Sequence, residues 1–278
     1  MFLLFGFYSL LAQALLLREI AQVFTAHELS LAAALACWLL WTAAGVRLGA
    51  RPADGRAFSL GCIIFAVSAP LNLLLARLAP GLLPGMSQPG LFTMLAGSAL
   101  LCLPAGLANG YAAGAAMRLP AGRQAATPAF FYAAEAAGAA AAGLFTVFYY
   151  RYFPGLEAAA ALAAPALVLC AAYALKPFSV RRLSAALAAA LALGAINFAA
   201  PRSWTLKSPA HRPGLVIQTE GSRLALTGHA DFLFYEDGRL LYAPETTAPE
   251  ELVHIALLAL KKPGKALLHG GGAFFVLP

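Results

Sequence analysis

The sequence predicts a mainly α-helical membrane protein, in which a bundle of about seven transmembrane helices precedes a small part rich in β-hairpins. Of its 278 residues, 61% are hydrophobic and only 11% are charged, whereas soluble domains carry roughly 25% charged residues. Long apolar runs fill residues 1–200, and a run of about 18 or more apolar residues predicts a membrane span. After residue 213 the pattern changes to an alternation of period two, which is typical of strands.

Seven apolar segments are candidates for membrane spans. The first is short and can extend to Phe24, but it lacks the basic start of a cleaved signal peptide, so we interpret it as a span. Short breaks that contain arginine or proline separate the segments. The predicted spans are residues 1–17, 30–48, 58–78, 91–117, 129–149, 156–175 and 183–200.

The basic residues give the chain a formal net charge of +7. Most of those between spans lie in loops, as the positive-inside rule expects, so they do not indicate nucleic-acid binding. Alternate loops hold Arg47, Arg51 and Arg56, then Arg118 and Arg123, then Lys176, Arg181 and Arg182; the other loops hold Arg18, Arg77 and Arg151. The rule places the N-terminus inside and, with seven spans, the C-terminal part outside. An enzyme with a cytosolic cofactor would lie inside, and the sequence leaves this conflict open.

The fourth span carries Gly106, Gly110 and Gly114 at a spacing of four, which places them on one helix face. Small residues on one face allow the backbone of a neighbouring helix to approach closely. The neighbour is either another helix of the same bundle or, as the alternative, a second copy of the chain. The fifth span continues the pattern with Ala134, Gly138 and Ala142.

Glu135 is an acidic residue deep in an apolar run. Because an ionisable group is costly in hydrocarbon, we expect it to face the bundle interior or a watery cavity. It is either part of a path for cations or protons, or a structural residue hydrogen-bonded to a polar side chain such as Asn109 or Gln13.

The cysteines predict no metal site and no disulfide framework. All four lie in apolar segments without any metal-ligand spacing, and we interpret them as small packing residues. They are Cys37, Cys62, Cys102 and Cys170.

Residues 201–213 form a predicted linker, and residues 214–247 a small β domain. Alternating apolar residues predict two strands around Leu215–Ile217 and Leu224–Leu226, with a turn between them. Asp237-Gly238 lies between two further apolar runs and favours a tight hairpin turn, because type I′ turns require positive φ.

Residues 248–278 resemble the start of a nucleotide-binding α/β domain. Thr247 and Glu250 fit a capping box, which predicts a helix from there to about Leu260. A short apolar strand at 266–269 then ends in Gly270, Gly271 and Gly272. A glycine-rich turn after the first strand of a Rossmann-like sheet lets the backbone approach a cofactor, so these glycines are the candidate cofactor-binding residues.

This order of elements resembles the spermidine synthase (polyamine aminopropyltransferase) family. The hairpin at Asp237–Leu240, the Glu250 to His254 helix motif and the glycine turn at 270–272 carry the resemblance. The membrane part resembles the multi-spanning section fused to some of these proteins. The resemblance implies aminopropyl transfer in polyamine biosynthesis and decarboxylated S-adenosylmethionine or S-adenosylmethionine as cofactor. It also makes Glu250 and His254 weak candidates for substrate binding, although His254 alone is more typical of a packed helix residue.

Several positions depart from the family pattern. Leu241 stands where the family has a substrate-contacting glutamine, Ala248 and Pro249 replace its Tyr-His pair, and Ala273 replaces the aspartate after the glycines. The transfer needs a carboxylate base to deprotonate the attacking amine. We therefore expect a truncated, catalytically incomplete chain, assign no catalytic residue, and consider a frameshift after the glycines plausible.

Two further functions stay open. The membrane part could be a transporter module with Glu135 on a cation or polyamine path, or the whole chain could be a non-catalytic membrane scaffold. The expected partners are the lipid bilayer, polyamine and a second copy of the chain through Gly106, Gly110 and Gly114, and no nucleic acid. The expected location is a multi-pass position in a bacterial-type inner membrane, and the resemblance favours a cytoplasmic C-terminal part.

Overall fold

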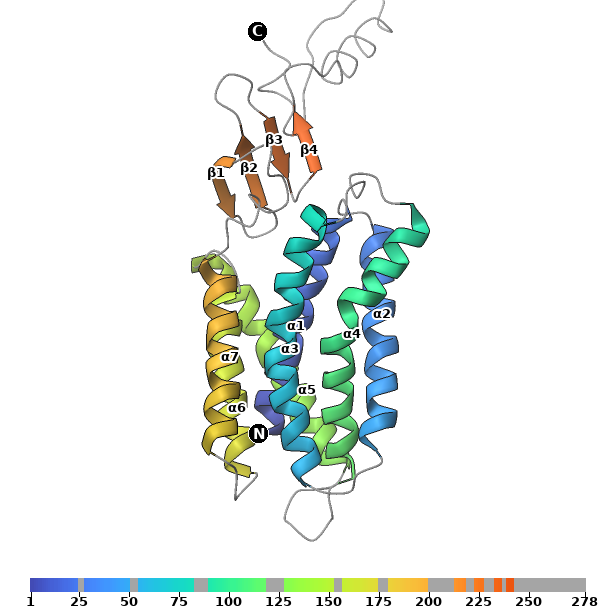
Figure 1. Ribbon diagram of the computed structural model, residues 1–278, viewed down its shortest axis with the longest axis vertical. Helices are drawn as coiled ribbons and strands as arrows, with labels where there is room; N and C mark the ends of the chain where they lie inside the picture. The colour runs from blue at the N-terminus through green and yellow to red at the C-terminus, as the bar shows by residue number, and fades with distance from the viewer. Residues whose placement is uncertain are drawn as a thin grey trace, which may run out of the picture.

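Seven helices and four strands make up the described part of the chain (Figure 1). The computed structural model describes residues 1–24, 28–50, 55–82, 90–118, 128–152, 157–174, 180–199, 213–218, 223–227, 233–236 and 239–242. The helices are α1 (Phe2–Val23), α2 (Glu28–Gly49), α3 (Gly55–Leu82), α4 (Leu91–Ala116), α5 (Pro128–Tyr152), α6 (Glu157–Ala174) and α7 (Val180–Ala199). Seven helices thus form where seven apolar segments predict them.

Five of these helices are long and apolar enough to cross a membrane. The five segments are Phe2–Ala21, Glu28–Gly49, Arg56–Ala79, Leu91–Ala116 and Pro128–Tyr149. Helices α6 and α7 contain shorter apolar segments, Ala159–Ala172 and Leu183–Ile196. By length and composition, the described part of the chain is therefore compatible with an integral multi-pass membrane protein.

The helices alternate in direction along the chain, as their mutual contacts show. Tyr8 contacts Ala66, and Glu19 contacts Arg77, so α1 and α3 are parallel with an offset of 58 residues. The bonds from Cys37 and Trp41 of α2 to α4 have the same offset of 58 residues. The α1–α2 hairpin thus lies beside the α3–α4 hairpin in a single register. Figure 1 shows the same alternation from α1 to α7.

Aromatic rings join α1, α3 and α5 close to the N-terminus. The ring of Phe131 lies edge-on to Phe2, with centroids 5.2 Å apart, and edge-on to Phe58 at 6.4 Å. Phe5 lies against Phe58 and Phe65 at 6.0 Å from each. Edge-to-face ring pairs contribute about 0.5–1.5 kcal/mol beyond the area they bury. The rings therefore fix the start of α5 against α1 and α3.

Large apolar side chains also cover the outside of the bundle. Phe92 is 84% exposed, Leu100 is 70% exposed and Val147 is 69% exposed. A soluble protein rarely exposes such contiguous apolar surface, because its burial elsewhere would be favourable. The distribution instead fits a bundle whose outer surface faces lipid, in agreement with the predicted membrane part.

Four antiparallel strands follow the bundle in the order β1-β2-β3-β4. They are β1 (Pro213–Gln218), β2 (Arg223–Thr227), β3 (Leu233–Glu236) and β4 (Arg239–Tyr242). Leu215 pairs with Leu226 and Ile217 with Leu224, so apolar residues face one another across β1 and β2. Glu236 pairs with Arg239, so β3 and β4 are paired strands separated by two residues in the sequence, and the turn predicted at Asp237-Gly238 itself lies outside the described residues.

Several predicted segments lie outside the described residues. These are most of the linker 201–213, the capped helix after Thr247 and the strand with its glycine turn in 248–278. The boundaries 1–200, 201–213, 214–247 and 248–278 consequently stay predictions. Within the bundle, α1 and α3 extend beyond the predicted spans 1–17 and 58–78 to Val23 and Leu82.

Candidate functional site

A buried ion pair joins α1 and α3. The Arg77 guanidinium donates a hydrogen bond of 2.8 Å from Nη2 to Oε1 of Glu19, and the two side chains are 0% and 1% exposed. Charged groups in a membrane interior are expensive and are retained where they pair with one another. Sequence reasoning counted Arg77 among the loop residues, which is wrong because α3 continues past it to Leu82, whereas α1 continues past Glu19 to Val23, close to the extension to Phe24 that the sequence allowed. A charge inside an apolar run indicated that each of the two residues needs a partner, but it did not indicate which residue that partner is.

A second polar contact lies on α3, five residues before the ion pair. Asn72 is fully buried and donates a hydrogen bond of 2.8 Å from its side-chain nitrogen to the carbonyl of Leu101 in α4. The indole of Trp41 donates a bond of 2.8 Å to the carbonyl of Ala99. Both acceptors precede Pro104, which lies inside α4 and has no N–H for the helix ladder. The two acceptors lie on either side of the carbonyl that loses its helical donor to this proline, so the bonds join α2 and α3 to α4 close to that point.

Tyr8 supplies a hydrogen-bond donor that the backbone of α3 lacks. The missing N–H of Pro70 leaves the carbonyl of Ala66, four residues earlier, without its helical donor. The Tyr8 hydroxyl is buried and donates a hydrogen bond of 3.2 Å to that carbonyl. A tyrosine of α1 thus completes the backbone bonding of a proline-containing helix, a role that sequence reasoning did not assign to it.

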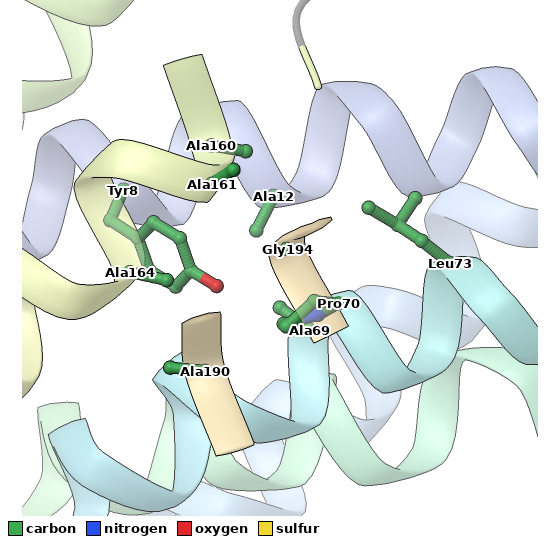
Figure 2. A pocket seen from close by; sticks show the side chains of 10 residues that line it. All are labelled: Tyr8, Ala12, Ala69, Pro70, Leu73, Ala160, Ala161, Ala164, Ala190 and Gly194. Carbon is green, nitrogen blue, oxygen red and sulfur yellow. The ribbon is translucent and has the colours of Figure 1, made fainter. Parts of the chain in front are cut away.

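The Tyr8 ring borders a small cavity between α1, α3, α6 and α7 (Figure 2). The volume open to the centre of a water molecule is about 10 Å³, which is room for about one water molecule at most. Alanines make most of its wall: Ala12, Ala69, Ala160, Ala161, Ala164 and Ala190, with Tyr8, Pro70, Leu73 and Gly194 completing it. The cavity is too small and too apolar to hold a polyamine or a nucleoside.

Glu135 lies on α5 at the contact with α1, half-buried, with its backbone against Gly6. No hydrogen bond or ion pair joins its carboxyl to another residue in the described ranges. The hydroxyl of Ser9 donates a bond of 3.1 Å to the side-chain oxygen of Asn109 instead. The structure therefore pairs Asn109 with Ser9, and neither Asn109 nor Gln13 is hydrogen-bonded to Glu135.

The face with Gly106, Gly110 and Gly114 packs on α2 of the same chain. A Cβ atom added to Gly110 would overlap the carbonyl oxygen of Thr42, and one added to Gly114 would overlap that of Val46. The small residues therefore let two helix backbones touch, as sequence reasoning expected for packing inside the bundle. Because α2 already covers this face, a second copy could use these glycines only if α2 moved away.

The fifth span shows the same type of contact. Gly138 and Ala142 are buried, and a Cβ atom added to Gly138 would overlap the carbonyl oxygen of Leu3 in α1. On the α1 side, Gly6 meets the backbone of Glu135. Close backbone approach therefore attaches α5 to α1 and fixes where the carboxyl of Glu135 lies.

The remaining predicted site residues lie outside the described ranges, and the described cysteines form no metal site. Gly270, Gly271, Gly272, Glu250 and His254 lie in the part that the structure does not describe. Across the described residues no group of three histidine, cysteine or acidic side chains could hold a metal ion. The cysteines are all free thiols; Cys37, Cys62 and Cys102 are buried in the bundle, and Cys170 is exposed.

Comparison with known protein families, with curated proteins and with solved structures gave no match.

Three polar groups in the described part of the bundle are candidates for function. They are the Glu19–Arg77 pair, the Ser9–Asn109 pair and the half-buried Glu135. Within the described residues the two pairs can hold helices in register, and the carboxyl of Glu135 can accept a cation or a hydrogen bond.

Proposed function

We propose that this chain is a spermidine synthase-like membrane protein, in which the helical bundle carries a small β domain and a cofactor-binding segment. One observation supports the proposal: the order of elements after the bundle. The paired strands β3 and β4, with Asp237-Gly238 between them in the sequence, precede the Glu250 to His254 motif and the glycines 270–272. This is the order that the family resemblance implies for aminopropyltransferases.

The reaction of the intact family transfers an aminopropyl group from decarboxylated S-adenosylmethionine to an amine. In this chain the glycine turn at 270–272 would hold the cofactor, because glycines let the backbone approach it closely. Glu250 and His254 are weak candidates for contacts to the polyamine. Ala273 stands where the family has an aspartate, and Leu241 stands where it has a glutamine. We therefore propose binding by these residues without turnover.

The test uses the full chain, purified in detergent and titrated with decarboxylated S-adenosylmethionine by calorimetry. We expect saturable binding that weakens at least tenfold in Gly271→Val, since the added side chain would occupy the space of the cofactor. Gly90→Val is the matched control, because no atom lies within 4 Å of its added Cβ. Absence of saturable binding at millimolar ligand would contradict the proposal, and formation of spermidine after adding putrescine would contradict the proposed lack of turnover.

A transporter module is the second candidate, and the observation that favours it is Glu135. Its half-buried carboxyl has no partner in the described ranges, and such groups in membranes mark ion paths. Proteoliposomes that contain the chain should then take up a polyamine, and Glu135→Gln should abolish the uptake. Unchanged uptake in this variant would remove Glu135 from the path. Lack of both uptake and cofactor binding would favour the non-catalytic scaffold.

The proposed location is a bacterial-type inner membrane. Five helices of sufficient length support a multi-pass position in a bilayer. The family resemblance alone favours a cytoplasmic position for the β strands and the segment that follows them.

A further inference from the structure

The distribution of arginines over the two ends of the bundle points to an orientation in the membrane. Short connections join successive helices; three residues separate Phe24 from Glu28, and an extended residue spans at most about 3.6 Å. A 22-residue helix such as α2 is about 33 Å long. Such a connection cannot return to the opposite end, so α2 begins at the end where α1 finishes.

The contacts between helices confirm this alternation without use of the connections. The bonds from Tyr8 to Ala66 and from Glu19 to Arg77 make α1 and α3 parallel. Gly61 packs on Ala112, whereas Asn72 bonds Leu101, so α3 and α4 are antiparallel. The end of α2, the start of α3 and the end of α4 therefore share one end of the bundle, which we call the arginine end.

The arginine end carries most of the positive charge near the membrane. Arg47 lies in the last turn of α2, Arg56 in the first turn of α3, and Arg118 directly after α4. The connections at this end add Arg51, Arg123 and Lys176, and the first turn of α7 adds Arg181 and Arg182. Basic residues near span ends determine orientation, and they remain on the cytoplasmic side.

The opposite end holds fewer basic residues. By sequence position these are Arg18, Arg77 and Arg151, with Arg202, Lys207 and Arg212 in the segment after α7. Arg77 is buried in the ion pair with Glu19, and Glu28 and Glu157 begin α2 and α6 at the same end. The end therefore holds six basic residues against eight at the arginine end, and one of the six is neutralised by its ion pair.

The strands follow the bundle at this less basic end, and the result does not depend on whether α6 and α7 cross the membrane. These two helices pack against each other through Gly194 and Ala161 and form a hairpin. A hairpin that spans twice or not at all returns the chain to the end where α5 finished. In Figure 1 the four strands lie beyond the end of the bundle opposite to the N-terminus.

We propose that the arginine end faces the cytoplasm and its anionic lipid headgroups, so that β1–β4 lie on the non-cytoplasmic side. The inference replaces the cytoplasmic position that the family resemblance alone favours. It is independent of the proposed cofactor binding, because purified protein in detergent exposes both sides to a cofactor. If both proposals hold, the small β domain would meet amines supplied from outside the cytoplasm, and its cofactor would have to reach that side.

The test labels single added cysteines in cells that express the full chain, with a charged maleimide that does not cross membranes. Ser222→Cys reports the turn between β1 and β2, and Ala53→Cys reports the connection between α2 and α3. The unmodified chain is the control for its four native cysteines, which lie in the membrane part. We expect at least tenfold more labelling of Ser222→Cys than of Ala53→Cys in intact cells, and equal labelling after permeabilisation.

Two results would overturn the orientation. Preferential labelling of Ala53→Cys in intact cells would invert it, and protection of both cysteines until permeabilisation would place both sites in the cytoplasm. Alkaline phosphatase fused after Pro278 provides a second measurement, because this enzyme folds only outside the cytoplasm. An active fusion supports the orientation, and an inactive fusion contradicts it even where the cysteine variants are poorly expressed.

Discussion

The α2–α4 and α1–α3 interfaces both join parallel helices and both contain side-chain hydrogen bonds, but the α2–α4 interface adds direct contact between the two backbones. Between α2 and α4 the backbones touch at Gly110 and Gly114. Between α1 and α3 the register depends on side chains, namely the Glu19–Arg77 ion pair and the Tyr8 hydroxyl. Because lipid is as apolar as leucine, hydrophobicity alone does not drive helices together in a membrane. Close shape complementarity and polar pairing are two ways to hold helices together in lipid, and the bundle uses both.

Loss of one partner of the ion pair should give the largest effect. Arg77→Leu leaves the Glu19 carboxyl buried without its cation, and we expect a loss of about 3–5 kcal/mol in the free energy of unfolding. Thermal unfolding followed by circular dichroism in detergent measures this loss. The double variant Glu19→Leu/Arg77→Leu should recover most of the stability, because it buries no charge. A double variant as unstable as the single one would show that the pair does not act through charge.

A side chain on the α2–α4 face should give the next largest effect. Gly110→Ala places a Cβ atom against the carbonyl of Thr42, and overpacking of this kind costs about 1–3 kcal/mol. Gly143→Ala is the matched control on α5, because its added Cβ lies 3.7 Å from the side chain of Leu10, an ordinary contact distance. Equal unfolding temperatures for the two variants would contradict a tight α2–α4 contact.

Removal of the Tyr8 hydroxyl should lower stability by a similar amount. Tyr8→Phe leaves the carbonyl of Ala66 without a donor, and an unsatisfied buried carbonyl costs about 1–3 kcal/mol. In a Pro70→Ala background the helix supplies its own N–H, so the same substitution should then cost clearly less. This double-mutant cycle separates the hydrogen bond from the packing of the ring. Equal costs in both backgrounds would exclude the compensation of Pro70 by Tyr8.

The Ser9–Asn109 bond should give the smallest effect. Hydrogen bonds between membrane helices contribute about 0.6 kcal/mol on average, so we expect Ser9→Ala to lower stability by roughly that amount. Ser68→Ala is the control, since its hydroxyl bonds the carbonyl of Phe65 within the same helix. If Ser9→Ala lowered stability by more than Tyr8→Phe does, the Ser9–Asn109 bond would have to be part of a larger hydrogen-bond network. Both variants are compared by the same thermal unfolding measurement.

The contrast between the two interfaces also explains what the sequence could predict. The spacing of Gly106, Gly110 and Gly114 is local, so it indicated one packed helix face, but it could not identify α2 as the neighbour. The Glu19–Arg77 pair joins residues 58 positions apart, and no local pattern links them. The link between Tyr8 and Pro70 was equally invisible, because it depends on which carbonyl a tyrosine of another helix reaches.

The β strands were predictable for a related reason. The two-residue turn at Asp237-Gly238 and the alternation around it are local signals, and Glu236 indeed pairs with Arg239 across it. For the membrane-embedded candidate, sequence reasoning identified Glu135 from its charge in an apolar run. It could not identify the surroundings of that residue, because the Ser9–Asn109 bond depends on the arrangement of α1 against α4.

The contact between α1 and α5 also has a consequence for how the protein is made. Gly6 and Gly138 attach the two helices to each other, but ribosomes add roughly 5–20 residues each second, so α5 follows α1 after about 7–26 s. During that interval the Gly6 face of α1 has no partner from its own chain. Until α5 is inserted, either the insertion machinery or the surrounding lipid must cover this face. Translation speed over the intervening codons therefore sets how long this face stays open to a wrong neighbour.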